Sequence, residues 1–320
     1  MSALLDRLSV ERPIVQAGMG GGLSRARLAA AVSEAGGLGT IGFLPAGELR
    51  REIASARERT ERPVAANLLL PFARAEHFEA ASDADLVVTF WGEPRRRSDR
   101  PWIHQCGSAE EARAAHAAGA DGVIVQGVEA GGHVRGEVPA LELLARVRDE
   151  LPPGYPVMVA GGIAEAADVR EALAAGADAA VLGTRFLLTP ESDAHPEYRR
   201  RLVEARETVL TELFGMGWPA KHRVVANEAL RRWTRADARG PALVLALNRA
   251  TAPLLARAPA RMQEALAGRQ SARLPLLGPV GPTADRPDSL VEAGALYAGE
   301  TVERIRDVRP ASELVRELAP

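Results

Sequence analysis

The feature that most constrains this chain is a series of eight short, β-prone segments between residues 13 and 186, which alternate with helix-like stretches rich in Ala, Arg and Glu. Apolar residues are nearly continuous within these segments, as is typical of parallel strands buried on both faces. Eight such units are the number that closes a TIM barrel, so we predict a (β/α)8 fold. The predicted strands are 14–17, 38–41, 64–68, 86–90, 102–105, 122–126, 157–160 and 180–183.

The chain has 320 residues, which is more than these eight units need. We expect a barrel over residues 1–190 and a helical appendage over residues 191–320 that covers one barrel face as a lid. The fourth connection, 91–101, is short and bounded by prolines, so it should lack a crossover helix and its arginines should lie in a solvated loop. Helices of the second part are predicted at 197–213, 224–233, 252–267, 297–305 and 311–318.

The composition argues against several classes of protein. Lys and Arg total 40 and Asp and Glu total 42, so the net charge of −2 offers no electrostatic surface for nucleic acid or an anionic membrane. No segment has the roughly 20 apolar residues of a membrane span, and charged residues interrupt the first twelve residues, which therefore lack the continuous apolar stretch expected of a signal peptide. The one cysteine, Cys106, excludes a disulfide framework and should be a buried small apolar residue. We therefore expect a cytoplasmic protein that binds a small molecule.

Glycine-rich turns follow the last two predicted strands, at the barrel face where active sites form. Glycine lets backbone N–H groups approach an anion closely, and these two loops are the usual phosphate site of a barrel. A hydroxyl in the second loop adds a donor. We predict a phosphate site here; the alternative is that the glycines only relieve crowding in tight turns. The residues concerned are Ala160, Gly161, Gly162, Val181, Leu182, Gly183 and Thr184.

Another glycine-rich run follows the first strand and begins with Ala17, Gly18 and Met19. It is not a dinucleotide fingerprint, because Leu23 occupies the position where the third glycine is required. The run suits a backbone lying against a flat ring, and a plain flexible turn is the alternative.

Asn67 and Gln126 end the third and sixth predicted strands. A neutral amide donates and accepts hydrogen bonds at once, so each could pair with the edge of a heterocyclic ring. The alternative is that each amide binds loop backbone.

His133 follows Gly131 and Gly132 in the loop after the sixth strand. A histidine next to paired glycines should point into the cleft, where its imidazole can exchange protons near neutral pH or orient a substrate. We predict that His133 is catalytic. His104 lies nearer the barrel mouth, and no histidine pair has metal-ligand spacing, so we predict no metal site. We expect the remaining histidines to lie on the surface: His77, His116, His195 and His222.

These motifs together resemble the FMN-dependent nitronate monooxygenases, formerly called 2-nitropropane dioxygenases. The Gln-Gly-x-Glu-Ala-Gly-Gly-His motif over 126–133 is the most specific, and the FMN-dependent enoyl-ACP reductases share it. The resemblance extends to 298–302 and 310–315. It implies that His133 is the active-site histidine and that alkyl nitronates are oxidised with O2 to carbonyl compounds and nitrite. The residues that would hold FMN are Met19, Asn67, Gln126, Gly131, Gly162 and the turn from Val181 to Thr184.

Two other functions remain open at this point. One is an NAD(P)H-dependent FMN reductase of enoyl thioesters or quinones, which the shared motif also allows. The other is a barrel synthase that binds phosphate without a flavin. The shortened segment 91–101 borders the substrate side, so the substrate is the least determined part of the prediction. A homodimer is compatible with each of the three functions.

Overall fold

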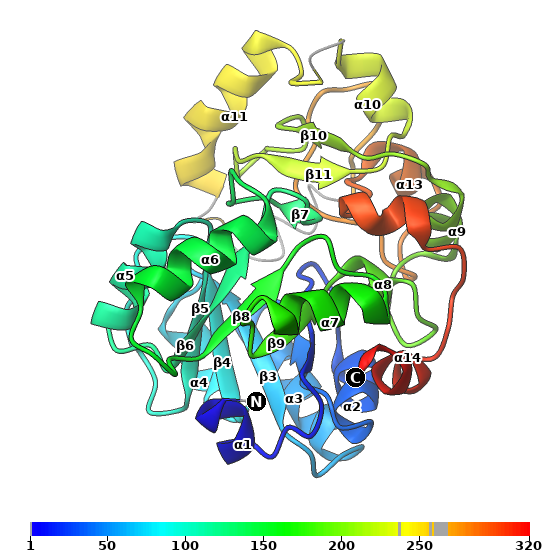
Figure 1. The fold of residues 1–320 in the computed structure, drawn as a ribbon. Coiled ribbons are helices and arrows are strands. Elements are labelled where there is room, and N and C mark those ends of the chain that lie inside the picture. The colour runs from blue at the N-terminus through cyan, green and yellow to red at the C-terminus, as the bar shows by residue number, and fades with distance from the viewer. Residues whose placement is uncertain (1, 236–237, 256–257, 259–267) are drawn as a thin grey trace.

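The computed structural model describes residues 2–235, 238–255, 258 and 268–320. It contains an eight-stranded parallel barrel with helices outside it and a second group of elements above its carboxyl-terminal face (Figure 1). The predicted fold class is confirmed. The barrel strands are β1 (Ile14–Gln16), β2 (Gly39–Ile41), β3 (Val64–Leu69), β4 (Leu86–Phe90), β5 (Trp102–Cys106), β6 (Gly122–Gln126), β8 (Val157–Ala160) and β9 (Ala179–Leu182).

The barrel closes almost completely. Its strand order is β1-β9-β8-β6-β5-β4-β3-β2, and β1 meets β2 again through a parallel bridge between Val15 and Leu38. The Gln16 N–H donates to the Leu38 carbonyl at 2.9 Å, and the Leu38 N–H donates to the Ile14 carbonyl at 2.9 Å. The carboxyl ends of all eight strands therefore point to one face.

Helices cover the outside of the barrel because each turns an apolar side toward the strands. They are α2 (Ala26–Glu34), α3 (Ala46–Arg57), α4 (Ala75–Ala81), α5 (Ala109–Ala117), α6 (Ala140–Glu150) and α7 (Ala166–Ala174). Residues 91–101 contain no helix, as predicted. The helix after β9, α8 (Thr184–Leu187), is a single turn. The chain's last helix, α14 (Ala311–Leu318), packs between α2 and α7 and completes the outer layer.

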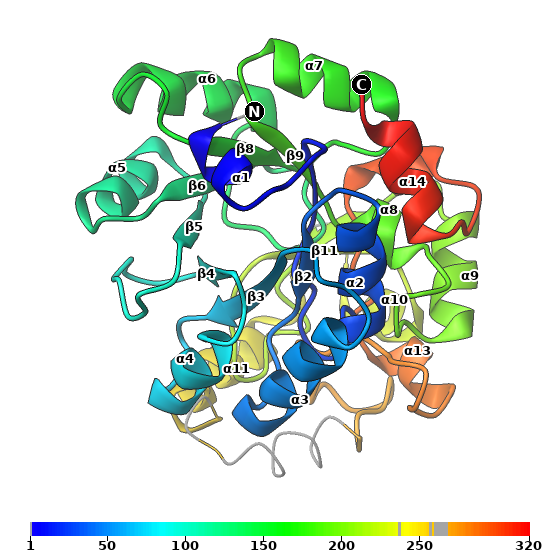
Figure 2. The same cartoon turned by 90° about the horizontal axis from the view of Figure 1, so that it is seen from below.

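Aliphatic side chains fill the barrel interior at its amino-terminal end. The short helix α1 (Ala3–Arg7) lies across this opening, as Figure 2 shows from below. Its Leu4 and Leu5 pack against Val15, Ile103 and Met158 inside the barrel. This end is closed by apolar packing, so a ligand enters from the other face.

The part after residue 190 is less helical than predicted. Helix α9 (Pro196–Glu204) ends early, and two antiparallel strands follow, β10 (Val209–Thr211) and β11 (His222–Val224). The predictions of one helix over 197–213 and of a helix beginning at 224 were therefore wrong, because long-range strand pairing outweighs local helical preference here. The other elements are α10 (Glu228–Trp233), α11 (Ala242–Leu255), α13 (Ser289–Ala293) and the 3₁₀ helix η1 (Glu300–Arg304).

Three further predictions in this part have different outcomes. In place of the helix predicted over 297–305, the structure has an extended start and then the five-residue 3₁₀ helix η1. The helix predicted over 252–267 falls mostly outside the described residues; α11 begins ten residues before it. The final helix over 311–318 is confirmed. No helix among the described residues is long and apolar enough to cross a bilayer.

A small sheet joins the two parts of the chain. Strand β11 pairs on one side with β10 and on the other with β7 (Gly132–His133), which belongs to the loop after β6. His133 is the register partner of His222, and Gly132 is that of Arg223. The part of the chain from α9 to η1, which includes β10 and β11, is called the lid from here on. The predicted catalytic histidine is therefore held by backbone pairing to the lid as well as by the barrel.

Candidate active site

A cavity of about 920 Å³ lies between the carboxyl ends of the strands and the lid. Fourteen of the fifteen predicted site residues line it: Ala17, Gly18, Met19, Asn67, Gln126, Gly131, Gly132, His133, Ala160, Gly161, Gly162, Val181, Gly183 and Thr184. The exception is Leu182, whose fully buried side chain packs in the core between strands and outer helices. Strand alternation turns it away from the cavity, so only its backbone borders the site.

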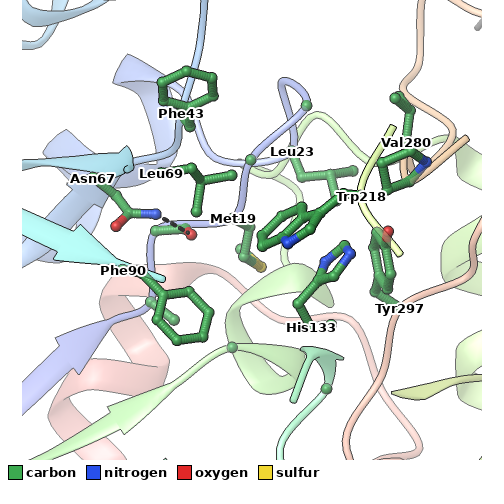
Figure 3. Close-up of a pocket in the computed structure, with 18 of the residues that line it drawn as sticks. Met19, Leu23, Phe43, Asn67, Leu69, Phe90, His133, Trp218, Val280 and Tyr297 are labelled. Atoms are coloured by element: carbon green, nitrogen blue, oxygen red, sulfur yellow. Dashed lines mark hydrogen bonds between the residues drawn. The ribbon is translucent and has the colours of Figure 1, made fainter. Parts of the chain in front are cut away.

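The two strand-end amides bind backbone, which is the alternative that the sequence left open. The Gln126 Nε2–H donates to the His133 carbonyl at 3.0 Å, and its Oε1 accepts from the Arg135 N–H at 2.8 Å. The Asn67 Nδ2–H donates to the Gly18 carbonyl at 3.1 Å (Figure 3). Each amide therefore fixes a neighbouring loop of the site.

His133 stands in a row of rings (Figure 3). The Trp218 ring stacks on the imidazole with centroids 3.6 Å apart and planes 10° from parallel. The rings of His222 and Tyr297 lie 5.3 Å and 5.6 Å from it. Burial, together with the neighbouring His222, holds the pKa of His133 well below its usual range. The imidazole is therefore uncharged at neutral pH.

Three buried polar atoms around this row have no hydrogen-bond partner among the described residues: His133 Nε2, Trp218 Nε1 and Tyr297 Oη. Leaving such an atom unpaired costs about 1–3 kcal/mol. All three residues line the cavity; the indole N–H and the phenol O–H are donors, whereas His133 Nε2 donates or accepts according to its tautomer.

His222 is fully buried, which contradicts the predicted surface position. Its Nδ1 donates to the Ala220 carbonyl at 2.9 Å, and its Nε2 accepts from the Phe214 N–H at 3.2 Å. Burial lowers the pKa of His222 to about 4. These two bonds hold a neutral imidazole in one tautomer beside His133. His77 and His195 are also buried, against expectation, whereas His116 is exposed as predicted.

Sequence reasoning missed Trp218 and Tyr297, which line the cavity from the lid. Trp218 lies in the β10–β11 connection and follows Gly215 and Gly217, a glycine pair that marks a loop able to approach a site closely. Tyr297 has no comparable local signal. Its backbone bridges to Val224 of β11, so only the fold brings it to His133.

The loops after β8 and β9 present backbone and hydroxyl donors. Gly161 and Gly162 have left-handed φ angles of 108° and 74°, which only glycine adopts without strain. The Thr184 hydroxyl oxygen accepts from the Gly299 N–H at 2.9 Å, which leaves its own hydrogen free to donate. A Cβ added at Gly183 would meet the Ala17 Cβ at 3.8 Å, an ordinary van der Waals contact, so this glycine is not required by crowding.

The shortened connection contributes one residue to the neighbourhood of the site. Trp91 has a left-handed φ of 64°, and its ring meets those of Phe90 and Trp218 edge-on at 5.4 Å and 5.2 Å. The arginines of the connection, residues 95–97, are exposed, as predicted. Cys106 is fully buried, also as predicted. Within the described residues there is no cluster of His, Cys, Asp or Glu suited to a metal ion.

Known proteins share this architecture over the whole chain. FabK of Thermotoga maritima is 30% identical with a TM-score of 0.77, and the match covers 99% of this chain and 94% of FabK. Nitroalkane oxidase of Streptomyces ansochromogenes is 32% identical with a TM-score of 0.75, over 99% and 96% of the two chains. A curated relative in Mycobacterium tuberculosis, (3aS,4S,5R,7aS)-5-hydroxy-7a-methyl-1-oxo-octahydro-1H-indene-4-carboxyl-CoA dehydrogenase, is 32% identical over 72% of this chain and 67% of its own.

The family model described as nitronate monooxygenase matches residues 1–91 and 93–320. This match includes the barrel, the lid and the final helix. The chain therefore belongs to the nitronate monooxygenase family of oxidoreductases.

Proposed function

We propose that the protein is an FMN-dependent nitronate monooxygenase that oxidises nitronates with O2 to carbonyl compounds and nitrite. The observation that carries the proposal is the position of His133, which lines a glycine-rich cavity at the carboxyl ends of the strands and has a buried Nε2 without a partner among the described residues. The family membership and the likeness to nitroalkane oxidase support the same activity.

The cavity fits FMN by the chemistry of its donors. Gly161, Gly162, Gly183 and Thr184 would bind the phosphate through backbone N–H groups and a hydroxyl. The Gly18–Met19 backbone, fixed by Asn67, would lie against the flat isoalloxazine ring. The cavity volume of about 920 Å³ is near the top of the range of roughly 300–1,000 Å³ for small-molecule sites, so a substrate can share it.

The bound flavin would supply the electron transfer to O2, and the protein's own residues would position the substrate. His133 is neutral near pH 7, so its imidazole can form a hydrogen bond with a bound nitronate without placing a cation in the buried site. Gln126 and the β7–β11 pairing hold its backbone from two sides. Trp218 covers its face and reduces the access of water.

An NAD(P)H-dependent reductase is the second candidate. The likeness to FabK over nearly all of both chains favours it, and so does a cavity with room for more than a short nitronate. The two candidates share the flavin and differ in the electron donor.

Oxygen consumption separates the candidates. With flavin-loaded protein and propyl 2-nitronate in air, we expect O2 uptake without NADH and its loss in His133→Ala. Turnover no faster than in that variant would refute the monooxygenase proposal. Rapid anaerobic bleaching of the flavin band by NADPH would instead support the reductase.

The cofactor is tested separately by thermal unfolding. FMN at about 100 times its Kd should stabilise the protein by roughly 2.7 kcal/mol. A colourless protein that FMN does not stabilise would point to a phosphate-binding barrel without a flavin.

A further inference from the structure

Aromatic side chains are scarce in this chain, yet they gather along one side of the cavity. Phe, Trp and Tyr make up 4% of the sequence, and five of these residues line the cavity: Phe43, Phe72, Phe90, Trp218 and Tyr297. Consecutive ring centroids are 6.4 Å apart from Phe43 to Phe72, 5.4 Å from Phe72 to Trp218 and 3.6 Å from Trp218 to His133. This row, with Tyr297 beyond His133, is called the aromatic wall.

The rings of Phe72, Phe90 and Trp218 lie away from the proposed phosphate site. In the closed strand order, β3 and β4 stand opposite β8 and β9. Phe72 follows β3, Phe90 ends β4, and Trp218 comes from the lid above them. The glycine loops after β8 and β9 are thus across the barrel from these rings. A flavin anchored by its phosphate at those loops would leave the aromatic wall to the substrate.

The two ends of the aromatic wall differ chemically. At the inner end, the Trp218 Nε1–H and the Tyr297 hydroxyl are buried donors without partners among the described residues, beside His133 Nε2. At the outer end, the rings of Phe43 and Phe72 present carbon edges and faces. The Phe43 ring also stacks on His77, with centroids 5.1 Å apart and planes 16° from parallel.

We propose that the substrate carries a flat conjugated ring attached to its reacting group. The ring lies along Phe72 and Trp218, where offset or edge-on contacts between rings are favourable. The oxygens of the nitronate or carbonyl group accept hydrogen bonds from Trp218 Nε1 and Tyr297 Oη. This inference rests on the proposed function and narrows its substrate from short alkyl nitronates to ring-bearing ones.

Binding of two unreactive carboxylates tests the inference without turnover. Phenylacetate and isobutyrate both carry two acceptor oxygens, and only phenylacetate has a ring. Tryptophan fluorescence and the visible spectrum of the purified protein report their Kd values. We expect the Kd of phenylacetate to be about tenfold below that of isobutyrate. The reason is that its ring makes aromatic contacts with the wall that isobutyrate cannot make. Equal Kd values would overturn the inference.

Variants separate the contribution of the ring from that of the donors. Phe72→Leu should reduce the preference for phenylacetate to about threefold or less. Trp218→Phe and Tyr297→Phe keep a ring but lose a donor, so both carboxylates should bind more weakly while the preference remains. Phe78→Leu is the matched control, since Phe78 belongs to α4, packs in the core and does not line the cavity. An unchanged preference in Phe72→Leu would also overturn the inference.

Turnover distinguishes failure of this inference from failure of the proposed function. The nitronate of phenylnitromethane should have a KM about tenfold below that of propyl 2-nitronate in the O2 assay. If neither nitronate is oxidised but phenylacetate is still preferred, the proposed function fails and the ring-bearing ligand stands. If both are oxidised with equal KM and the carboxylates bind equally, the proposed function stands and the ring-bearing substrate is refuted.

Discussion

At the scale of single residues, glycines of the site serve different physical needs. A Cβ at Gly131 would come within 2.4 Å of the Gly299 backbone nitrogen, so this glycine allows two backbones to touch. Gly162 has no such neighbour; the nearest atom to an added Cβ is 3.9 Å away, in Glu129. Its requirement is the left-handed φ of 74° that turns the loop toward the proposed phosphate site.

Gly162→Ala should weaken FMN binding more than it weakens the fold. The left-handed φ costs a side chain about 1–2 kcal/mol, and Gly154→Ala is the matched control because Gly154 has a φ of 78° and open space remote from the cavity. Urea unfolding should show similar losses in both variants. Fluorescence titration with FMN should show a raised Kd in Gly162→Ala alone. Equal FMN affinities in the two variants would argue against phosphate binding at this loop.

At the scale of elements, β7 is the connection on which the site depends. It is two residues long, and β11 pairs with it, so the barrel loop and the lid share one sheet (Figure 1). Arg223 of β11 strengthens this connection from a buried position. Its guanidinium lies 2.8 Å from the Val128 carbonyl and 2.9 Å from a carboxylate oxygen of Glu300.

Arg223→Met should lower kcat about tenfold and change the FMN Kd by less than twofold. Loss of the Arg223 contacts should displace His133 slightly, and small displacements of a catalytic group lower kcat strongly. The FMN Kd should hardly change, because the glycine loops after β8 and β9 keep their own contacts. The control is Arg249→Met, which removes an exposed pair with Glu212 at 3.2 Å and should be nearly silent. Stopped-flow and steady-state assays with FMN titration measure both quantities. If kcat falls by the same factor in Arg223→Met and Arg249→Met, the position of β7 does not depend on Arg223.

The elements also show what the sequence could reveal. The barrel strands were predictable because continuous apolar runs and glycine turns are local signals, and the rule for strand ends then placed His133, Gly162 and Thr184 together. Strands β10 and β11 were missed because three residues carry no periodicity and their pairing is long-range. The aromatic wall was missed for the same reason. Trp218 and Tyr297 come close to His133 only through the long-range strand contacts of β11. The division of the chain at residue 190 stays a prediction.

At the scale of the whole molecule, buried histidines make stability depend on pH. Burial lowers the pKa of His104 and that of His222 to about 4 each, whereas an unfolded histidine has a pKa near 6.5. Below pH 6.5 the unfolded chain takes up protons that the folded chain does not. The stabilisation is therefore complete above pH 6.5 and is lost as the pH falls toward 4.

When the pH falls from 7.5 to 5, each of these two histidines should lower the free energy of unfolding by about 2 kcal/mol. His222→Gln should remove about that much of the pH dependence, whatever its effect at pH 7.5. His116→Gln, which changes an exposed residue, should leave the pH dependence as it is. Urea unfolding at the two pH values measures the difference. An unchanged pH dependence in His222→Gln would contradict the expectation.

The pairing of β7 with β11 also limits how relatives of this protein can exchange parts. A chimera joined at residue 190 would place a foreign strand against Gly132 and His133, so the histidine would take its position from the donor of the second half. Recombination at residue 190 would therefore change the position of His133 and the aromatic wall at the same time. New substrate ranges are therefore more accessible through point substitutions within the lid than through transplantation of the lid as a unit.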